Sequence, residues 1–159
     1  MPVIDQSTCP VRTGSLYPAP YDQYVAGRSS LRLGEAGGLT QFGANLVTLQ
    51  PGAKSSMRHW HHNEDEFVMI TMGACTLVQD DGGTVMRVGD CAAFKAGDRN
   101  GHQFINHTDA EARFLVVGTR APRERAEYSD VDLVLDLTLG EQGGARFTHR
   151  DGCDYTGPR

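Results

Sequence analysis

The sequence predicts an all-β protein, an antiparallel barrel or sandwich, and three observations lead to this prediction. Between residues 39 and 119, seven or eight short runs rich in apolar and β-branched residues follow one another at close, regular spacing. Glycine, aspartate and proline, which favour turns, separate the runs. No long segment has the 3.6-residue period of an amphipathic helix.

The individual strands are identified from alternating apolar positions and from the turns that end them. The first run stops at Pro51-Gly52, a typical turn pair. A hairpin is expected at Asp80-Asp81-Gly82-Gly83, which joins two runs. The expected strands span residues 39–49, 58–61, 66–72, 75–79, 84–88, 91–95, 102–107 and 112–119.

With 159 residues, the chain has the size of one domain. We expect residues 1–24, rich in proline and tyrosine, to form an N-terminal arm over the body, with room for one edge strand. Residues 25–120 are expected to form the barrel. Residues 121–159 are expected to form a C-terminal extension packed on the barrel, with a further apolar stretch at residues 130–135.

The charge pattern argues against nucleic acid as a partner. The formal net charge is −5, and the basic residues are scattered along the chain. Arg123 and Arg125 stand close together, but Glu124 and Glu127 balance them, so we interpret this segment as a solvated face.

The N-terminal residues do not resemble a targeting signal, and no apolar run approaches the eighteen residues of a membrane span. The four cysteines are far apart and form no Cys-x-x-Cys pair, so no disulfide framework is expected. Cys75 and Cys91 fall in expected strands, where they would be small buried apolar groups. We therefore expect a cytoplasmic protein.

Residue types that bind metals are concentrated between residues 58 and 66. In an extended segment, His59 and His61 point to the same side, separated by a gap that one metal ion can bridge. Glu66 begins the next strand on an otherwise apolar face, where a carboxylate is costly unless it is paired or binds a cation. His102, on a later strand, can join them if the sheet curls. Such a ligand set leaves coordination positions open for catalysis, so we predict one divalent transition metal.

The spacing around these residues is similar to the first sequence motif of the cupin superfamily. Six residues separate Gly52 from His59-x-His61, four more precede Glu66, and another six precede Gly73. The motif usually has five residues after its first glycine, so this chain has one extra.

A second segment resembles the second cupin motif. Five residues separate Gly89 from Lys95-Ala96-Gly97, and His102-x-x-x-Asn106 follows. Lys95 stands where the family usually has proline. Four residues rather than two separate Gly97 from His102.

The two motifs span residues 52–106, and the resemblance implies a jelly-roll β-barrel of the cupin type with a three-His, one-Glu metal centre in its interior. The resemblance also implies a homodimer, which cupins often form. Cupins include dioxygenases, decarboxylases, isomerases, lyases and non-catalytic binding or storage proteins. The chain looks most similar to small single-domain bacterial cupins. The ligand set does not select among iron, manganese, nickel and zinc.

Several neighbouring residues are alternatives to these ligands. Strand parity turns His62 away from the site, toward the surface or toward the ligands' outer contacts, and separates His107 from His102. Glu64 and Asp65 compete with Glu66, and the motif spacing to Gly73 favours Glu66.

Three further residues have ordinary interpretations beside the functional ones. His149 lies in the tail and is expected to be a surface or packing residue. For Lys95 we prefer a solvated turn residue over an anion or carbonyl contact near the mouth of the site. Asn106 is either an outer contact of the metal centre or a turn former.

Two functions from different classes follow. The first is a metal-dependent enzyme, dioxygenase-like or sugar-phosphate-isomerase-like, that acts on a small oxygenated molecule, with Glu66 also accepting a proton. No second acid or base stands out, which favours chemistry done by the metal, such as oxygenation. Val68, Ile70, Met72 and Phe104 are expected to shape the pocket. The alternative is a binding or sensor module without turnover.

Overall fold

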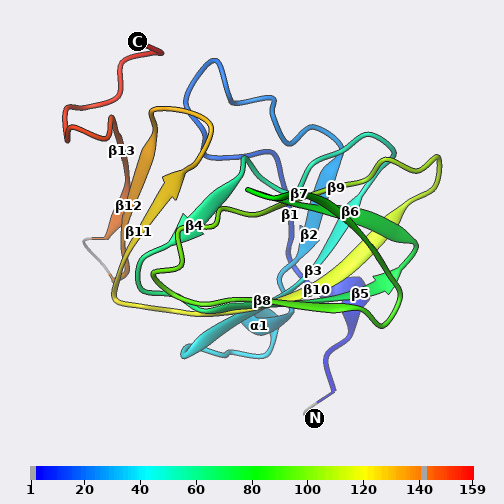
Figure 1. Ribbon diagram of the computed structural model, residues 1–159. Coiled ribbons are helices and arrows are strands. Elements are labelled where there is room, and N and C mark those ends of the chain that lie inside the picture. Colours follow the sequence, from blue (N-terminus) through cyan, green and yellow to red (C-terminus); the bar gives the residue numbers. More distant parts are fainter. Residues whose placement is uncertain (1–2, 141–142) are drawn as a thin grey trace.

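Three antiparallel sheets surround one interior in the computed structural model, which describes residues 3–140 and 143–159 (Figure 1). Their strand orders are β1-β2-β3-β10-β5-β8, β7-β6-β9 and β13-β12-β11-β4. The strands are β1 (Val11–Thr13), β2 (Arg28–Leu31), β3 (Phe42–Leu49), β4 (His59–His61), β5 (Glu66–Met72), β6 (Ala74–Gln79), β7 (Gly82–Arg87), β8 (Cys91–Phe94), β9 (Gln103–Ile105), β10 (Ala112–Thr119), β11 (Arg123–Tyr128), β12 (Val134–Thr138) and β13 (Gly144–Thr148). The described helices are a 3-10 turn (Gln6–Thr8) and α1 (Leu33–Ala36).

The predicted strands between residues 39 and 119 are confirmed, each within a few residues of its expected bounds, as β3 to β10. The expected hairpin is present between β6 and β7, where Gln79 pairs with Gly82 around a two-residue turn. Gly82 has φ +117°, a conformation that residues with a Cβ rarely adopt. The all-β jelly-roll barrel predicted from the sequence is therefore the observed fold.

The core lies between the six-stranded and the three-stranded sheets. Strand register aligns Val47, Phe114 and Ile70 across β3, β10 and β5, and all three side chains are buried. Leu77 and Phe104 approach them from β6 and β9. Because side chains of a strand alternate between its faces, one apolar residue in two is enough to fill this interior.

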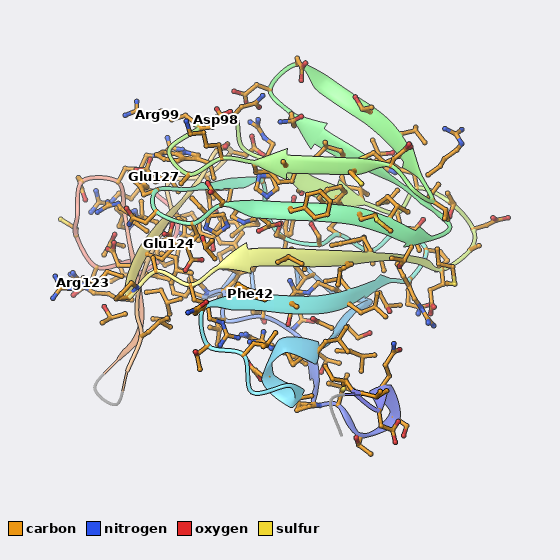
Figure 2. The ribbon with its side chains drawn as sticks, turned by 90° about the horizontal axis from the view of Figure 1, so that it is seen from below. Phe42, Asp98, Arg99, Arg123, Glu124 and Glu127 are labelled. Carbon is orange, nitrogen blue, oxygen red and sulfur yellow. The ribbon has the colours of Figure 1, made fainter. Side chains whose placement is uncertain are left out.

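The outer face of the six-stranded sheet is also apolar. Phe67 and Met69 are 41% and 36% exposed, and Met69 pairs with Cys91 of β8. Cys75 is buried as expected, but the prediction of a buried Cys91 is wrong, because the parity of β8 places its thiol on this outer face. Figure 2 shows the molecule from below, with Phe42 of β3 labelled.

Both ends of the chain contribute strands. In the N-terminal arm, β1 pairs with β2 at the edge of the six-stranded sheet. The region after Pro122, where the sequence indicates only one apolar stretch, forms β11, β12 and β13. Strand β11 pairs with β4, so the C-terminal region holds the strand that carries His59 and His61. None of the described helices is long and apolar enough to cross a membrane.

Candidate metal centre

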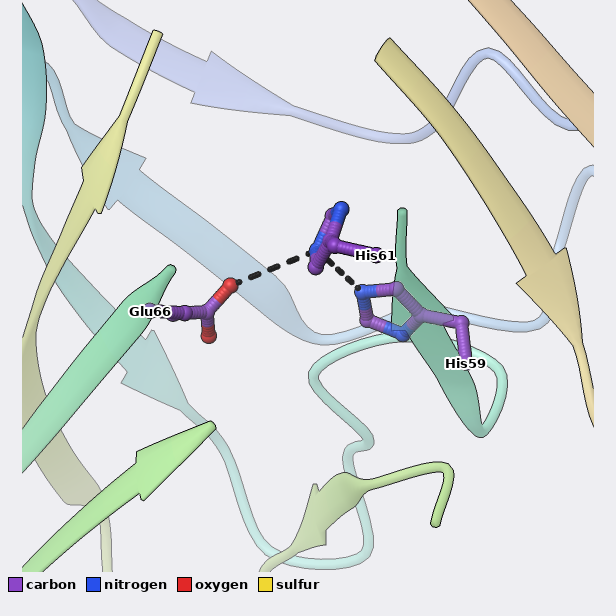
Figure 3. A group of neighbouring side chains, drawn as sticks. All are labelled: His59, His61 and Glu66. Carbon is purple, nitrogen blue, oxygen red and sulfur yellow. Dashed lines mark hydrogen bonds and ion pairs between the residues drawn. The ribbon is translucent and has the colours of Figure 1, made fainter. Parts of the chain in front are cut away.

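Two short strands place three predicted ligands together (Figure 3). On β4, alternation directs His59 and His61 to the interior side, while Trp60 packs on the opposite side. Glu66 begins β5 and extends toward the two imidazoles. Among the described residues, His59, His61 and Glu66 form the group whose ligand atoms all lie within 4.8 Å of one another.

The distances within this group fit a transition metal. His59 Nε2 lies 3.2 Å from His61 Nε2, which lies 3.6 Å from Glu66 Oε2. Metal–ligand bonds of about 2.0–2.2 Å place adjacent ligand atoms about 2.8–3.6 Å apart. His59 Nδ1 is 2.9 Å from the Met57 carbonyl oxygen, a contact that points Nε2 at the centre, as outer contacts of metal-binding histidines commonly do.

His102 lies beside the group. Its Nε2 is 3.6 Å from Glu66 Oε1, and its backbone forms a bridge with His59. The imidazole is buried and stacks on Phe94 with ring centroids 3.6 Å apart. Neither ring nitrogen of His102 has a hydrogen-bond partner within the described chain. A buried nitrogen left unpaired in this way is what a metal ligand requires.

The electrostatics differ sharply among the ligands. Burial, and then the charges of His61 and His102, lower the pKa of His59 to about 3, so this imidazole is neutral near pH 7. Burial acts to lower the pKa of His61, but the nearby carboxylates of Glu124 and Glu66 outweigh it and raise that pKa to about 10. Burial opposes the ionisation of Glu66, yet the imidazoles of His102 and His61, each 3.6 Å from one of its oxygens, hold its pKa below the ordinary value. The pocket therefore holds one carboxylate among imidazoles, a donor set suited to a divalent cation.

Glu124 is a residue of the site that the sequence interpretation missed. We predicted a solvated face for residues 123–127, but Glu124 is only 6% exposed and lies 3.4 Å from His61 Nδ1. It also accepts hydrogen bonds from the backbone amides of His62 and Asn63. The prediction fails because β11 buries alternate residues, and Figure 2 shows Glu124 on this strand with Arg123 and Glu127. The signal that identifies Glu124 is its spacing of two residues from Ala126, and of four from Tyr128, which places all three on the buried face of one strand.

The group opens into an interior cavity of about 430 Å³. Of the four apolar residues expected to shape the pocket, only Phe104 lines it. Val68 and Ile70 are buried in the core, and Met72 is 36% exposed because a register shift in β10 opposite the end of β5 turns it outward. The apolar wall comes instead from β3, β10 and the C-terminal sheet, through Val47, Phe114, Val116, Leu135, Leu137 and Phe147.

The cavity also has a polar wall that the sequence interpretation did not anticipate. It includes the side chains of Arg12, Arg28, Arg32, Asn45, Ser30, Ser55, Ser56, Tyr17 and Tyr128. The rings of Tyr17 and Tyr128 pack edge to face with their centroids 5.4 Å apart, and the Tyr17 hydroxyl accepts a hydrogen bond from the Met57 amide. The Tyr128 ring lies 5.9 Å from the His59 ring, centroid to centroid.

The alternatives to the ligands lie away from the group. His62 stacks on Trp60 and pairs with Glu127 on the far side of β4, as parity predicts. Glu64 accepts a hydrogen bond from the Ala121 amide, and Asp65 accepts one from the Ala96 amide. Both acids therefore cap backbone groups rather than face the imidazoles.

The remaining candidates have structural roles. His107 is exposed, and His149 is buried with its Nδ1 2.9 Å from Asp132. Lys95 is an exposed residue at a narrow second opening behind His102. Asn106 is fully buried and fixes a turn, because its side chain bonds to the backbone of three other residues.

The fold and this site together define a jelly-roll barrel with an interior pocket able to hold a metal ion. A family model described as a cupin domain matches residues 45–118. Together with the 56% identical cupin structure described next, this match shows that the chain belongs to the cupin superfamily.

Solved structures extend this assignment, whereas no curated protein matches the chain. The chain is similar to a sugar phosphate isomerase of the cupin superfamily from Silicibacter pomeroyi, with 56% identity, a TM-score of 0.93, and coverage of 98% of this chain and 97% of that one. A putative sugar phosphate isomerase from Acidithiobacillus ferrooxidans shares 23% identity and the fold, with a TM-score of 0.75 and coverage of 92% and 90%. A polyketide cyclase from Streptomyces resistomycificus shares 16% identity and the fold, with a TM-score of 0.59 and coverage of 75% and 79%.

Proposed function

We propose that this protein is a metal-dependent isomerase acting on a small oxygenated molecule. The observation that carries the proposal is that His59, His61 and Glu66 face an interior cavity with both apolar and polar walls. A cavity of this kind is typical of small-molecule sites. The similarity to a sugar phosphate isomerase at 56% identity supports isomerisation over oxygenation.

His59, His61, Glu66 and His102 are the proposed ligands of one iron, manganese, nickel or zinc ion. A divalent metal in this position supplies Lewis-acid polarisation of a substrate oxygen. Glu66 has two carboxylate oxygens directed at different imidazoles, so we assign it the further role of proton acceptor. Apolar residues around the cavity exclude water from the reacting atoms.

The structure weakens the sequence-based preference for oxygenation. That preference depended on the lack of a second proton-transfer group, and the hydroxyls of Tyr17 and Tyr128 on the cavity wall are candidates for one. Burial raises the pKa of both tyrosines, which keeps the hydroxyls protonated and able to donate to a substrate oxygen.

Metal analysis and turnover test the proposal with a matched pair of variants. His59→Ala is expected to lose bound metal and all turnover of sugar phosphates while remaining folded. His62→Ala removes an imidazole three positions along that points to the other side of β4, and it is expected to keep both properties. Protein from metal-replete growth without stoichiometric metal would contradict the proposal. Oxygen consumption with catechols or diketones would indicate a dioxygenase, and tight ligand binding without turnover would indicate a sensor.

We also propose that the protein forms homodimers through the outer face of the six-stranded sheet. Phe42, Phe67 and Met69 are exposed on this face beside Leu115, and a contiguous exposed apolar patch typically marks an interface. Met69→Asp is expected to give monomers in analytical ultracentrifugation, whereas Val85→Asp on β7 leaves the mass unchanged. A wild-type monomer at micromolar concentration would contradict the proposal.

We retain a cytoplasmic location and a small-molecule substrate as proposals. All four cysteines are free thiols, which suits a reducing compartment. The net charge of −5 is unfavourable for binding nucleic acid. Reaction of all four thiols with a maleimide after denaturation of protein from intact cells would support the location, and protected thiols would contradict it.

A further inference from the structure

One wall of the cavity is cationic, and strand register explains why. Arg28, Ser30 and Arg32 alternate along β2 and the residue after it, so their side chains share one face of the sheet. Arg12 of β1 is paired directly with Ser30, which places it on the same face. All four residues line the cavity that holds the candidate metal group.

The same face becomes apolar one or two strands further along the sheet. Ser30 pairs with Val47 of β3, and Val47 pairs with Phe114 of β10. Asn45, next to Val47 on the inner face of β3, pairs with Val116. The cationic wall is therefore confined to β1 and β2, beside the apolar part of the pocket on the same sheet.

Among the described residues, no acidic side chain forms an ion pair with Arg28, which stands on this wall. Arg28 donates to the carbonyl oxygens of Ser55 and Gly14, which are neutral acceptors. Its buried Nε has no partner within the described chain. Burial, and then repulsion from Arg12 and Arg32, lower the pKa of Arg28, so the three guanidinium groups act on one another.

The acids nearby account for only part of this charge. Arg32 pairs with Glu35, and no ion pair involves Arg12 in the part of the chain that the structure describes. Glu66 is the one acidic residue among the described residues that line the cavity, and it belongs to the candidate metal group. A partly buried guanidinium without a counter-charge is costly, and a bound anion removes that cost.

We propose that Arg28, with Arg12 and Arg32 toward the mouth, binds an anionic group of the substrate, a phosphate or a carboxylate. The proposal rests on the proposed function, because it places the reacting oxygens at the metal group and the anionic group at the cationic wall of the same cavity. Arginine suits this role because its planar fork binds both anions through two parallel hydrogen bonds. Arg12 comes from the N-terminal arm, so the arm contributes directly to substrate selection.

Titration calorimetry with simple anions tests the site separately from catalysis. The full-length protein, in metal-free and metal-loaded forms, is titrated with inorganic phosphate and, in a second arm, with acetate. We expect saturable one-to-one binding of one anion to both forms, and the preferred anion identifies the substrate group. Arg12→Gln is expected to weaken binding at least fivefold. Arg87→Gln, which removes the same charge from the exposed end of β7, is expected to change it less than twofold.

Arg28→Lys provides a second variant, because it retains the positive charge while removing the fork. It is expected to weaken binding of the preferred anion at least fivefold, and because it also loses hydrogen bonds to Ser55 or Gly14, binding is measured on protein that circular dichroism shows to be folded. Absence of saturable binding of both anions, or equal effects of Arg12→Gln and Arg87→Gln, would overturn the inference. A protein that binds phosphate but no metal would overturn the proposed function and leave this inference standing. A metal-loaded, active protein that binds neither anion would overturn this inference and leave the proposed function standing.

Discussion

Replacing Glu124 by glutamine tests whether this buried carboxylate supports both the fold and the metal group. Its oxygens accept from the amides of His62 and Asn63 at 2.9 and 3.0 Å. Each hydrogen bond to a charged group contributes about 1.5–3 kcal/mol. Glutamine keeps one acceptor but turns its own NH₂ donor against the second amide, so one such bond is lost and one buried donor is left unpaired. We expect the free energy of unfolding to fall by about 3 kcal/mol, equivalent to a Tm decrease of about 6–12 °C in a domain of this size.

The same substitution is expected to weaken metal binding. Glu124 lies 3.4 Å from His61 Nδ1, the nitrogen that faces away from the metal position. Loss of such an outer contact typically lowers metal affinity about 10–100-fold. Metal titration calorimetry measures this second effect on folded protein, independently of the change in stability.

Glu127→Gln is the matched control. Glu127 also contacts a histidine, at 2.9 Å from His62 Nε2, but its side chain is 28% exposed and it lies on the opposite face of β11. An exposed pair of this kind contributes under about 1 kcal/mol, so stability and metal affinity should change little. Urea denaturation of both metal-free variants provides the comparison. Equal effects of Glu124→Gln and Glu127→Gln on both quantities would refute the reasoning.

Three further predictions concern the frame around the site. Asn106→Ala removes donors to the Leu49 and Ala110 carbonyl oxygens at 2.9 and 2.7 Å. Urea denaturation should show the free energy of unfolding fall by about 2–4 kcal/mol, and a fall below about 1 kcal/mol would count against this role. Gly73→Ala should lower the free energy of unfolding by at least about 2 kcal/mol, because Gly73 has φ +69° and an added Cβ would lie 2.7 Å from the Glu111 carbonyl oxygen. An unchanged free energy of unfolding would contradict this prediction. Chelation should lower Tm, since metal at a hundred times its Kd stabilises the fold by about 2.7 kcal/mol, and an unchanged Tm after complete removal would argue against a bound metal.

Local sequence patterns were sufficient for the barrel strands. Alternation in residues 66–72 predicts β5, and Gly73 ends it where the φ of +69° excludes most other residues. The same alternation predicts the relation between His59 and His61, since two residues of one strand share a face whatever the rest of the chain does. These predictions succeed because they depend on backbone geometry within a few residues.

Pairing between distant strands is what the sequence patterns did not predict. Met72 illustrates this, because a register shift against β10 reverses its face although the pattern within β5 continues unbroken. The cationic wall likewise depends on β1 pairing with β2, which brings Arg12 next to Ser30 although seventeen residues separate them in the sequence. A charged residue on a strand is ordinarily interpreted as solvated, and only the identity of the neighbouring strand shows otherwise.

The candidate metal group itself depends on such pairing. Strand β4 has three residues, too few to be stable alone, and its geometry depends on its neighbours. His59 pairs with His102 across one edge and with Tyr128 across the other, while His61 pairs with Ala126. The C-terminal region thus fixes the two imidazoles and supplies Glu124 behind one of them. Residues outside the two cupin motifs are therefore needed to position the proposed ligands inside them, which explains why the motifs point to these residues without revealing what orients them.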